Sequence, residues 1–294
     1  MIWIGTSGYS FRDWVGTLYP AGTRQSDMLA HYVGHFPAIE INASYYRLPT
    51  AATFARMAER TPPRYRFVVK LQKELTHEGA TGRSGAGVER SPGRDLESRA
   101  EATVNAPAGE VAAQCRAFLQ AIEPLESSGR FHGALAQFPW GFRCTRQNLD
   151  HLRRLREGYP VLPLFVEFRH ESWARPETLR FLRDMSAGFV AVDEPRLKGL
   201  FPPWTETVGE IGYVRFHGRN AGAWWGGDNA GRYDYLYSEA ELEEWAGKIK
   251  EMSARTREMF VFFNNCHGGK AAQNAKRMGA LLGLPPFIEP GGPA

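Results

Sequence analysis

Short runs of β-branched and aromatic residues recur along the whole chain. Most of these runs are apolar nearly throughout, which is typical of parallel strands that are covered on both faces. The pattern predicts eight strands, near Ile2–Ser7, Ala38–Ser44, Arg66–Leu71, Gly133–Phe138, Leu164–Arg169, Phe189–Asp193, Tyr213–His217 and Phe260–Asn264.

Apolar residues at helical spacing fill the stretches between the predicted strands. Thr145 fits the N-cap of one helix, and Ser238 with Glu241 forms a Ser-x-x-Glu capping box for another. Repeated alternation of strand and helix predicts a single (β/α)8 TIM-type barrel over residues 1–294. An open doubly wound sheet is the main alternative, but it usually has fewer strands, and no Gly-x-Gly-x-x-Gly follows the first run. The apolar helical faces lie in Met28–Phe36, Val111–Ile122, Leu149–Leu155, Leu242–Met252 and Ala271–Leu282.

Two segments interrupt this alternation. The stretch Glu78–Pro107 is rich in Gly, Arg, Ser and acidic residues and has few aliphatic ones, so we expect an exposed loop inserted after the third strand. The stretch Leu197–Val208 contains Pro202, Pro203 and Trp204 and shows no helical period. We therefore expect the sixth helix to be short or missing.

Polar residues gather where the predicted strands end. Seven of the eight strands run apolar and then finish polar, and in a barrel of parallel strands all these ends meet at one mouth. A single charged strand end is usually just solvated, whereas seven together indicate a ligand site. The residues concerned are Glu40, Asn42, Ser44, Lys70, Gln137, Glu167, Arg169, Asp193, Arg215, His217 and Asn264.

Strand alternation predicts which way these side chains point. Residues two apart share a face, so Glu167 lies with Arg169, Arg215 lies with His217, and Glu40 lies with Asn42 and Ser44. The opposite faces are apolar and must contact the helices, so the charged faces point into the barrel mouth. A polar ligand that is anionic or polyhydroxylated would fit such a mouth. An ion network that only satisfies buried charges is the alternative.

Most residues of the predicted mouth are assigned a role from their chemistry. The candidate catalytic residues are Glu167, Asp193, His217 and Glu40, which can exchange protons with a ligand. Turn and loop residues that could reach the same ligand complete the set. The candidate ligand-binding residues are Lys70, Arg169, Arg215, Asn42, Gln137 and Asn264 from the strand ends, and Thr6, Ser7, Tyr9, His77, Trp224 and Tyr233 from the loops.

Proton transfer in this set would depend on unequal pKa values. Arg169 should lower the pKa of one of the two carboxylates Glu167 and Asp193, while burial and like charge should raise that of the other. His217 is the expected second proton carrier, because the reference pKa of histidine is about 6.5. On this view Glu167→Gln and His217→Ala remove turnover, and Arg215→Ala weakens ligand binding.

A metal site is a more specific form of the hypothesis that the barrel mouth binds a ligand. Glu167, Asp193 and His217 lie on three successive predicted strands and could hold one divalent ion with open positions. Nearby arginines can already neutralise these carboxylates, and the chain has no His-Glu-x-x-His signature. No cofactor is predicted, and a divalent metal is the one addition that these residues allow.

Composition limits the remaining classes. Lys and Arg number 36 against 32 Asp and Glu, a formal net charge of +4, which allows nucleic acid as a partner but does not favour it. No apolar run approaches the roughly 18 residues of a membrane span. Three cysteines without a Cys-x-x-Cys pair fit a reducing cytoplasm better than a disulfide framework.

The same residues carry a family resemblance. The chain resembles the YecE-like family, domain of unknown function seventy-two, from its first strand to its last helix. This resemblance implies a TIM-type barrel in a bacterial or archaeal cytoplasmic protein, and it implies no settled reaction. The chain departs from the family pattern at Tyr45, Trp140 and Cys266. The matching motifs are Ile4–Gly8, Trp14, Tyr19-Pro20, Glu40–Asn42, Tyr46–Pro49, Lys70, Thr76-His77, Gln137–Pro139, Glu167–Arg169, Trp173, Asp193, Pro195, Arg215–Gly218 and Phe263–Asn265.

Three functions remain open at this point. The first is an enzyme that performs non-redox acid–base or hydrolytic chemistry on a phosphorylated or polyhydroxylated small molecule. The second is a metal-dependent phosphodiesterase or nuclease, by analogy with endonuclease-IV-like barrels, which this type of barrel is similar to. The third is a non-catalytic ligand-binding protein.

Overall fold

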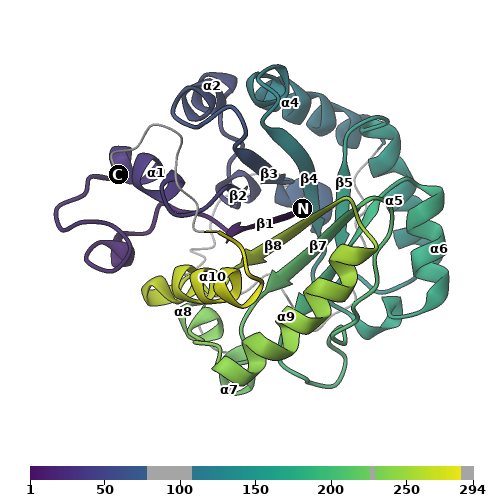
Figure 1. Cartoon of the computed structure of the whole chain (residues 1–294). Coiled ribbons are helices and arrows are strands. Elements are labelled where there is room, and N and C mark those ends of the chain that lie inside the picture. The colour runs from purple at the N-terminus through teal and green to yellow at the C-terminus, as the bar shows by residue number, and fades with distance from the viewer. Residues whose placement is uncertain (78–107, 226–228, 286–294) are drawn as a thin grey trace, which may run out of the picture.

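Eight parallel strands form a nearly closed barrel in the computed structural model, which describes residues 1–77, 108–225 and 229–285. The strands follow the order β1-β8-β7-β6-β5-β4-β3-β2, and helices surround them (Figure 1). The predicted TIM-type barrel is confirmed. The strands are β1 (Ile2–Thr6), β2 (Ala38–Ile41), β3 (Arg66–Lys70), β4 (Phe131–Gln137), β5 (Leu164–Glu167), β6 (Gly188–Asp193), β7 (Ile211–Phe216) and β8 (Glu258–Phe263).

The helices follow the predicted alternation. Thr145 accepts from the backbone of Asn148 at the start of α5, and the Ser238–Glu241 capping box opens α9, as predicted. The apolar pattern had not singled out α2 and α6. None of the described helices is long and apolar enough to cross a membrane. The helices are α1 (Met28–Val33), α2 (Ala51–Glu59), α3 (Lys73–Thr76), α4 (Ala108–Ser127), α5 (Arg146–Gly158), α6 (Pro176–Asp184), α7 (Ala221–Trp224), α8 (Asn229–Tyr233), α9 (Glu239–Ala254) and α10 (Lys270–Leu281).

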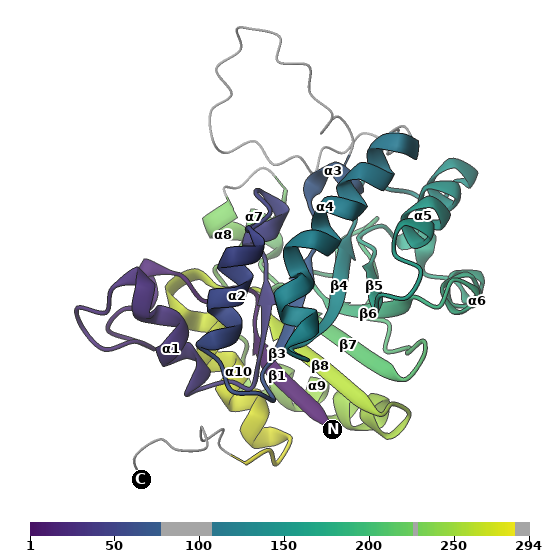
Figure 2. The same cartoon turned by 90° about the horizontal axis from the view of Figure 1, so that it is seen from above.

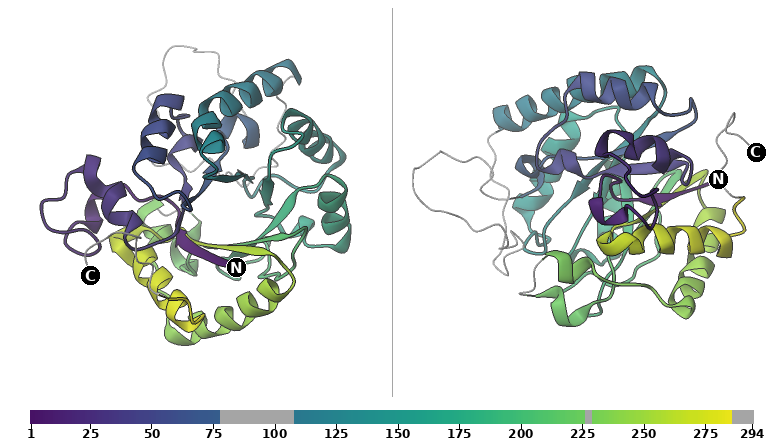
Figure 3. Two further views of the ribbon diagram at one scale, coloured as in Figure 1. Left: turned by 45° about the horizontal axis from the view of Figure 1, so that its top comes forward. Right: turned by 90° about the vertical axis from the view of Figure 1, so that its left-hand side faces the viewer.

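The two irregular segments have different outcomes. Residues 194–210, between β6 and β7, contain no helix. The helix expected after the sixth strand is therefore missing, as predicted, and the helix labelled α6 comes before that strand. The predicted loop Glu78–Pro107 lies outside the described residues. The short helices α3, α7 and α8 lie at the end of the barrel opposite the N-terminus, where the carboxyl ends of the strands meet (Figures 2 and 3).

Strand β2 ends earlier than predicted. After Ile41 the chain enters a 3-10 turn, Ala43–Tyr45, so strand alternation no longer applies to Ser44. The Ser44 hydroxyl donates to the backbone oxygens of Ile41 and Lys70, at 2.9 and 2.6 Å. The prediction that Ser44 shares a face with Glu40 is therefore wrong, because the hydroxyl caps the ends of β2 and β3.

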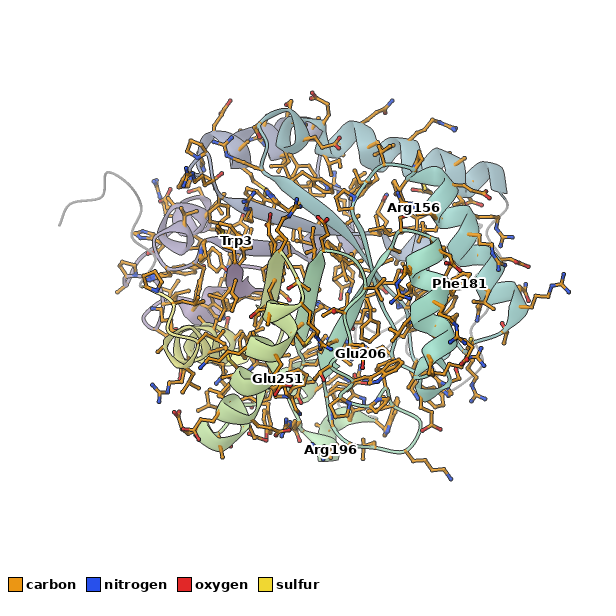
Figure 4. All side chains as sticks on the ribbon, turned by 45° about the vertical axis from the view of Figure 1, so that its right-hand side comes forward. Trp3, Arg156, Phe181, Arg196, Glu206 and Glu251 are labelled. Carbon is orange, nitrogen blue, oxygen red and sulfur yellow. The ribbon has the colours of Figure 1, made fainter. Side chains whose placement is uncertain are left out.

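Side chains fill the interior of the strand ring (Figure 4). Part of this interior is aromatic, since the Tyr213 ring lies 5.0 Å from that of Phe165 and 5.5 Å from that of Phe262. The Tyr213 hydroxyl donates to Glu40 Oε2 at 2.6 Å. This aromatic layer therefore adjoins the first charged layer and shields it from water.

The barrel closes through a close approach of β1 and β2. The backbone of Ser7 pairs with that of Glu40, and Gly8 N donates to Glu40 O at 2.8 Å. At Gly5 the approach is tighter, because a Cβ atom there would lie 2.1 Å from Ala38 O. Only glycine fits this position without moving the backbone of one strand.

Substitution of Gly5 tests this closure. We expect Gly5→Ala to lower the free energy of unfolding by about 1–3 kcal/mol, the usual cost of forcing atoms into a packed interior. The control is Gly247→Ala inside α9, where a Cβ would meet nothing within 4 Å. That change should stabilise the protein by about 0.5–1 kcal/mol, because alanine favours helix. Urea unfolding of both variants checks the opposite signs.

Candidate active site

Arg215 of β7 lies between two carboxylates inside the barrel. Its Nη2 donates to Glu40 Oε1 and its Nη1 donates to Glu167 Oε2, each at 2.6 Å. All three side chains are fully buried. Charge-assisted bonds of this length are strong, and they allow the three charges to remain in the barrel interior. Arg215 thus has its charge neutralised within the protein.

The network continues from Glu167 toward β6 and β8. Glu167 Oε1 forms an ion pair with Arg169, whose Nε lies 2.7 Å away, and accepts a hydrogen bond from His217 Nε2 at 3.1 Å. Arg169 Nη1 donates to Glu194 Oε2 at 2.6 Å. His217 Nδ1 lies 3.1 Å from Asn264 Nδ2, an amide donor. These partners assign His217 as a neutral imidazole that carries its proton on Nε2.

Two partly buried amides adjoin the network. Asn42 Nδ2 donates to Asn264 Oδ1 at 3.0 Å. Asn42 Oδ1 is buried and has no hydrogen-bond partner among the described residues. An amide oxygen in this state is suited to accept a hydrogen bond from a ligand hydroxyl.

Lys70 of β3 has different surroundings from the two arginines. Its Nζ donates to Gln137 Oε1 at 2.7 Å and lies 4.3 Å from the centre of the Tyr45 ring. Gln137 Oε1 also accepts from Arg215 Nη1 at 3.5 Å, which joins Lys70 to the network. Within the described residues no carboxylate lies at ion-pair distance from Lys70.

Most predicted mouth residues therefore meet in one network of hydrogen bonds and ion pairs. Ser7 belongs to it as well, with its hydroxyl oxygen 3.5 Å from Arg215 Nη2. Their roles toward a ligand stay predictions. The residues brought together are Glu40, Asn42, Lys70, Gln137, Glu167, Arg169, Arg215, His217 and Asn264.

Asp193 does not join this network, and the prediction that it would is wrong. Its Oδ1 accepts from Arg219 Nη2 at 2.8 Å and from Trp245 Nε1 of α9 at 2.7 Å. Alternation along β6 turns Asp193 toward the helix layer and places the next residue, Glu194, on the barrel side. Sequence reasoning missed Glu194, because the residues from Phe189 to Asp193 are all buried and the pattern of β6 alone does not show which face is the barrel side.

This register also separates the proposed metal ligands. Glu167 and His217 are hydrogen-bonded neighbours, whereas Asp193 faces α9. In the parts of the chain that the structure describes, no group of three or more His, Cys, Asp or Glu side chains is arranged to hold a metal ion. The trio Glu167, Asp193 and His217 is therefore not assembled as a metal site.

Thr6, the last residue of β1, and Tyr9 in the loop that follows also lie apart from the network. The Thr6 hydroxyl donates to Gly8 O at 2.7 Å and lies 2.8 Å from the Tyr32 hydroxyl of α1. The Tyr9 ring packs 6.1 Å from the Tyr32 ring. Both side chains thus contact α1, because Thr6 stands on the outward face of β1 while Ser7 stands on the inward one.

His77, Trp224 and Tyr233 were the remaining loop residues predicted to reach the ligand, and they lie at different distances from the network. The His77 ring lies 5.1 Å from that of Tyr45, which also covers Lys70. Trp224 is fully buried, with the Arg169 guanidinium 5.8 Å from its ring centre. Tyr233 is half-buried at the end of α8, and its role toward a ligand stays a prediction. His77 and Trp224 therefore border the network.

The pKa values of Glu167 and His217 do not favour these two residues as proton carriers near neutral pH. Burial alone would raise the pKa of Glu167, but Arg215 and Arg169 outweigh it and hold this pKa well below the usual range. Burial, followed by the charge of Arg169, lowers the pKa of His217 to about 3. His217 is therefore neutral near pH 7, because a second positive charge beside Arg169 is unfavourable, and its role as a proton carrier stays a prediction.

Lys70 is the network residue that titrates near neutral pH. Burial, and then the charge of Arg215, lowers its pKa to about 7, while Glu167 and Glu40 oppose this shift. The pKa of His77 falls to about 3, because of burial and the nearby Lys70. A group whose pKa is close to the working pH can both give and accept a proton. Sequence reasoning had assigned Lys70 only to ligand binding.

A separate cavity of about 290 Å³ lies at the other end of the barrel. It is bordered by Phe165 and Gly188 of β5 and β6 and by the segment that leads into β7. Its charged residues are Arg183 and Glu210. Active sites of TIM barrels lie at the carboxyl ends of the strands, so we take the Lys70 network as the candidate site.

Comparison with known proteins identifies the family. The family described as "Protein of unknown function DUF72" matches residues 3–291. The UPF0759 protein YunF of Bacillus subtilis is 31% identical over 295 residues, which cover 97% of this chain and 95% of that protein.

Two solved structures agree with this match. A DUF72 family protein from Thermotoga maritima is 39% identical, with a TM-score of 0.81 over 96% of this chain and 99% of that one. One from Enterococcus faecalis is 27% identical, with a TM-score of 0.80 over the full length of both. The resemblance to the YecE-like family is thus confirmed, and the chain belongs to the DUF72 family.

Proposed function

We propose that the protein is an enzyme that performs non-redox acid–base or hydrolytic chemistry on a small phosphorylated or polyhydroxylated molecule at the carboxyl end of the barrel. One observation carries this proposal: a buried ion network pairs Arg215 and Arg169 with carboxylates and leaves Lys70 beside an amide and an aromatic ring. A lysine held in this way is suited to bind an anionic group and to move a proton.

The network residues would divide this work. Glu40, Glu167 and Arg215 hold one another in place, so we assign them to positioning. Lys70 takes the proton-carrying role that the sequence had suggested for His217. Asn42, with its unpartnered amide oxygen, would orient a ligand hydroxyl.

A reducing cytoplasmic location fits this proposal. All three cysteines, Cys115, Cys144 and Cys266, are free thiols. Burial raises the pKa of the Cys266 thiol, which keeps it protonated and unreactive. We propose that the protein works in the cytoplasm.

Proton exchange with solvent tests the proposed chemistry without knowledge of the product. Sugar phosphates, aldonic acids and 2-oxo acids would each be incubated with the protein in D2O, and deuterium at carbon would be followed by proton NMR. We expect one or more of these compounds to exchange or to be converted. Lys70→Met should remove this activity, because methionine has similar bulk but carries no proton. Lys250→Met, an exposed change on α9, should keep it.

Binding of the same compounds, followed by calorimetry, separates an enzyme from a binding protein. Binding that is lost in Lys70→Met together with exchange supports the proposal. A compound that binds tightly to the wild type and is neither exchanged nor converted would show a non-catalytic binding protein. Full activity in Lys70→Met would contradict the role given to Lys70.

A further inference from the structure

Lys70 stands out among the buried cations at the barrel mouth. Arg169 and Arg215 each have a carboxylate oxygen within 2.7 Å. Among the described residues, Lys70 Nζ contacts the amide oxygen of Gln137 and the face of the Tyr45 ring. Its side chain is 8% exposed at the carboxyl end of β3. The amine is thus held in one place by groups that do not require it to be charged.

We infer that Lys70 is a nucleophile that forms an imine with the ligand, so that the substrate is an aldehyde or ketone with an anionic or polyhydroxylated body. This inference rests on the proposed function and names its substrate class. An ion pair would hold an ammonium, whereas an amide acceptor and an aromatic face accommodate a neutral amine as well.

The electrostatic surroundings favour the neutral amine that such a reaction needs. Burial, then Arg215 of β7, and Arg169 just after β5 disfavour a charge on Lys70, and Glu167 and Glu40 oppose them. The pKa of about 7 leaves a large share of the amine unprotonated near neutral pH. The remaining facing groups, Gln137 from β4, Tyr45 and His77, are uncharged there, since the pKa of His77 is about 3.

The step balances with water as the only product lost. The Nζ lone pair attacks the carbonyl carbon, a C–N bond forms, and a proton moves from nitrogen to oxygen to give a carbinolamine. One proton from solvent then allows the hydroxyl to leave as water, and the C=N bond forms as a protonated imine. Glu167 and Glu40 partly offset the unfavourable effect of burial, Arg215 and Arg169 on its positive charge. The imine draws electrons from the adjacent carbon and makes its C–H bond acidic.

Reductive trapping tests the inference on the intact protein. Dihydroxyacetone phosphate, glyceraldehyde 3-phosphate and pyruvate would each be added near pH 7 with sodium cyanoborohydride, which delivers hydride to the imine carbon. Intact mass and peptide mapping would locate the resulting secondary amine. We expect an adduct at Lys70, with labelling that rises with pH through about 7. Lys250→Met, on the surface of α9, should be labelled like the wild type.

Lys70→Arg is the sharper variant, because it keeps a cation but removes the nucleophilic amine. We expect its labelling and its deuterium exchange both to fall to background. Labelling spread over surface lysines with Lys70 unmodified overturns the inference, as does full exchange in Lys70→Arg.

The outcomes also separate the inference from the proposed function. A compound whose exchange requires Lys70 but which leaves no adduct there makes Lys70 a proton carrier alone. The imine is then overturned while the proposed function stands. If none of the tested carbonyl compounds binds, exchanges or is trapped, the substrate class is wrong. The proposed function then depends on the aldonic acids, and it fails too if they neither bind nor react.

Discussion

Replacing Glu167 with glutamine should lower the free energy of unfolding by about 3–5 kcal/mol, the cost of removing one partner from a buried ion network. Glu167 accepts a hydrogen bond from Arg215 at 2.6 Å and forms an ion pair with Arg169 at 2.7 Å, and all three side chains are almost completely buried. Glutamine has the same shape but no charge. It would take one carboxylate from both guanidinium groups, which would keep their ion pairs with Glu40 and Glu194.

Urea unfolding of this variant would be compared with that of Glu177→Gln on α6. Glu177 pairs with Arg180, but both side chains are more than half exposed. Its loss should cost about 0–1 kcal/mol, because water already screens the pair. A loss below about 1 kcal/mol for Glu167→Gln would show that the network contributes little to stability, contrary to the usual behaviour of buried ion pairs.

The pH dependence of this deficit has a definite sign. The folded pKa of Glu167 lies well below its usual value, since Arg215 and Arg169 outweigh the effect of burial. The unfolded chain therefore binds more protons at this site, and the stabilisation is fully present above about pH 4.5. It is lost only as the pH falls through the lower folded pKa. The deficit of Glu167→Gln should thus stay constant from pH 7 to about 4.5 and shrink in stronger acid.

The sequence was sufficient to predict the barrel and the location of the mouth. Strand runs such as Val166–Phe168 and Val214–Phe216 alternate with polar residues, and this period of two places Glu167 with Arg169 and Arg215 with His217. Both pairs lie in the observed network. The prediction depended only on the residues of one strand at a time.

The errors arose where more than one strand was needed. Asp193 and Glu194 are consecutive acids at the end of β6, and composition alone does not say which one faces the barrel. The pairing of Arg215 with two carboxylates depends on the stagger between β2, β5 and β7. Within the part of the chain that the structure describes, this pairing leaves no carboxylate at ion-pair distance from Lys70, so its unusual pKa could not be predicted from the charges alone.

Because of this pairing, some charged residues of the mouth stabilise the fold, whereas another destabilises it. Glu40, Glu167 and Arg215 satisfy one another and are expected to stabilise the fold. Lys70 is buried with no carboxylate at ion-pair distance among the described residues, which costs stability whenever the amine is protonated. A group that weakens the fold and lies at the functional end of a TIM barrel is a strong candidate for the chemistry.

Replacing Lys70 with methionine should stabilise the protein near neutral pH, and the gain should disappear as the pH rises. The folded pKa is about 7, whereas lysine in an unfolded chain titrates near 10.4. Between these values the unfolded chain binds more protons at this site, so wild-type stability rises with pH. The methionine variant lacks this contribution. Its advantage is therefore largest at pH 7 and below.

The difference between the two proteins should fall by roughly 1.4 kcal/mol per pH unit above pH 7, or at most about 4 kcal/mol by pH 10. Urea unfolding at pH 6, 7, 8, 9 and 10 measures it, and the slope is independent of any fixed change in packing. Lys250→Met, exposed on α9, should stay within about 0.5 kcal/mol of the wild type throughout. A constant difference between Lys70→Met and the wild type would mean that Lys70 keeps an ordinary pKa in the fold. The neutral amine on which the proposed chemistry depends would then be absent at pH 7.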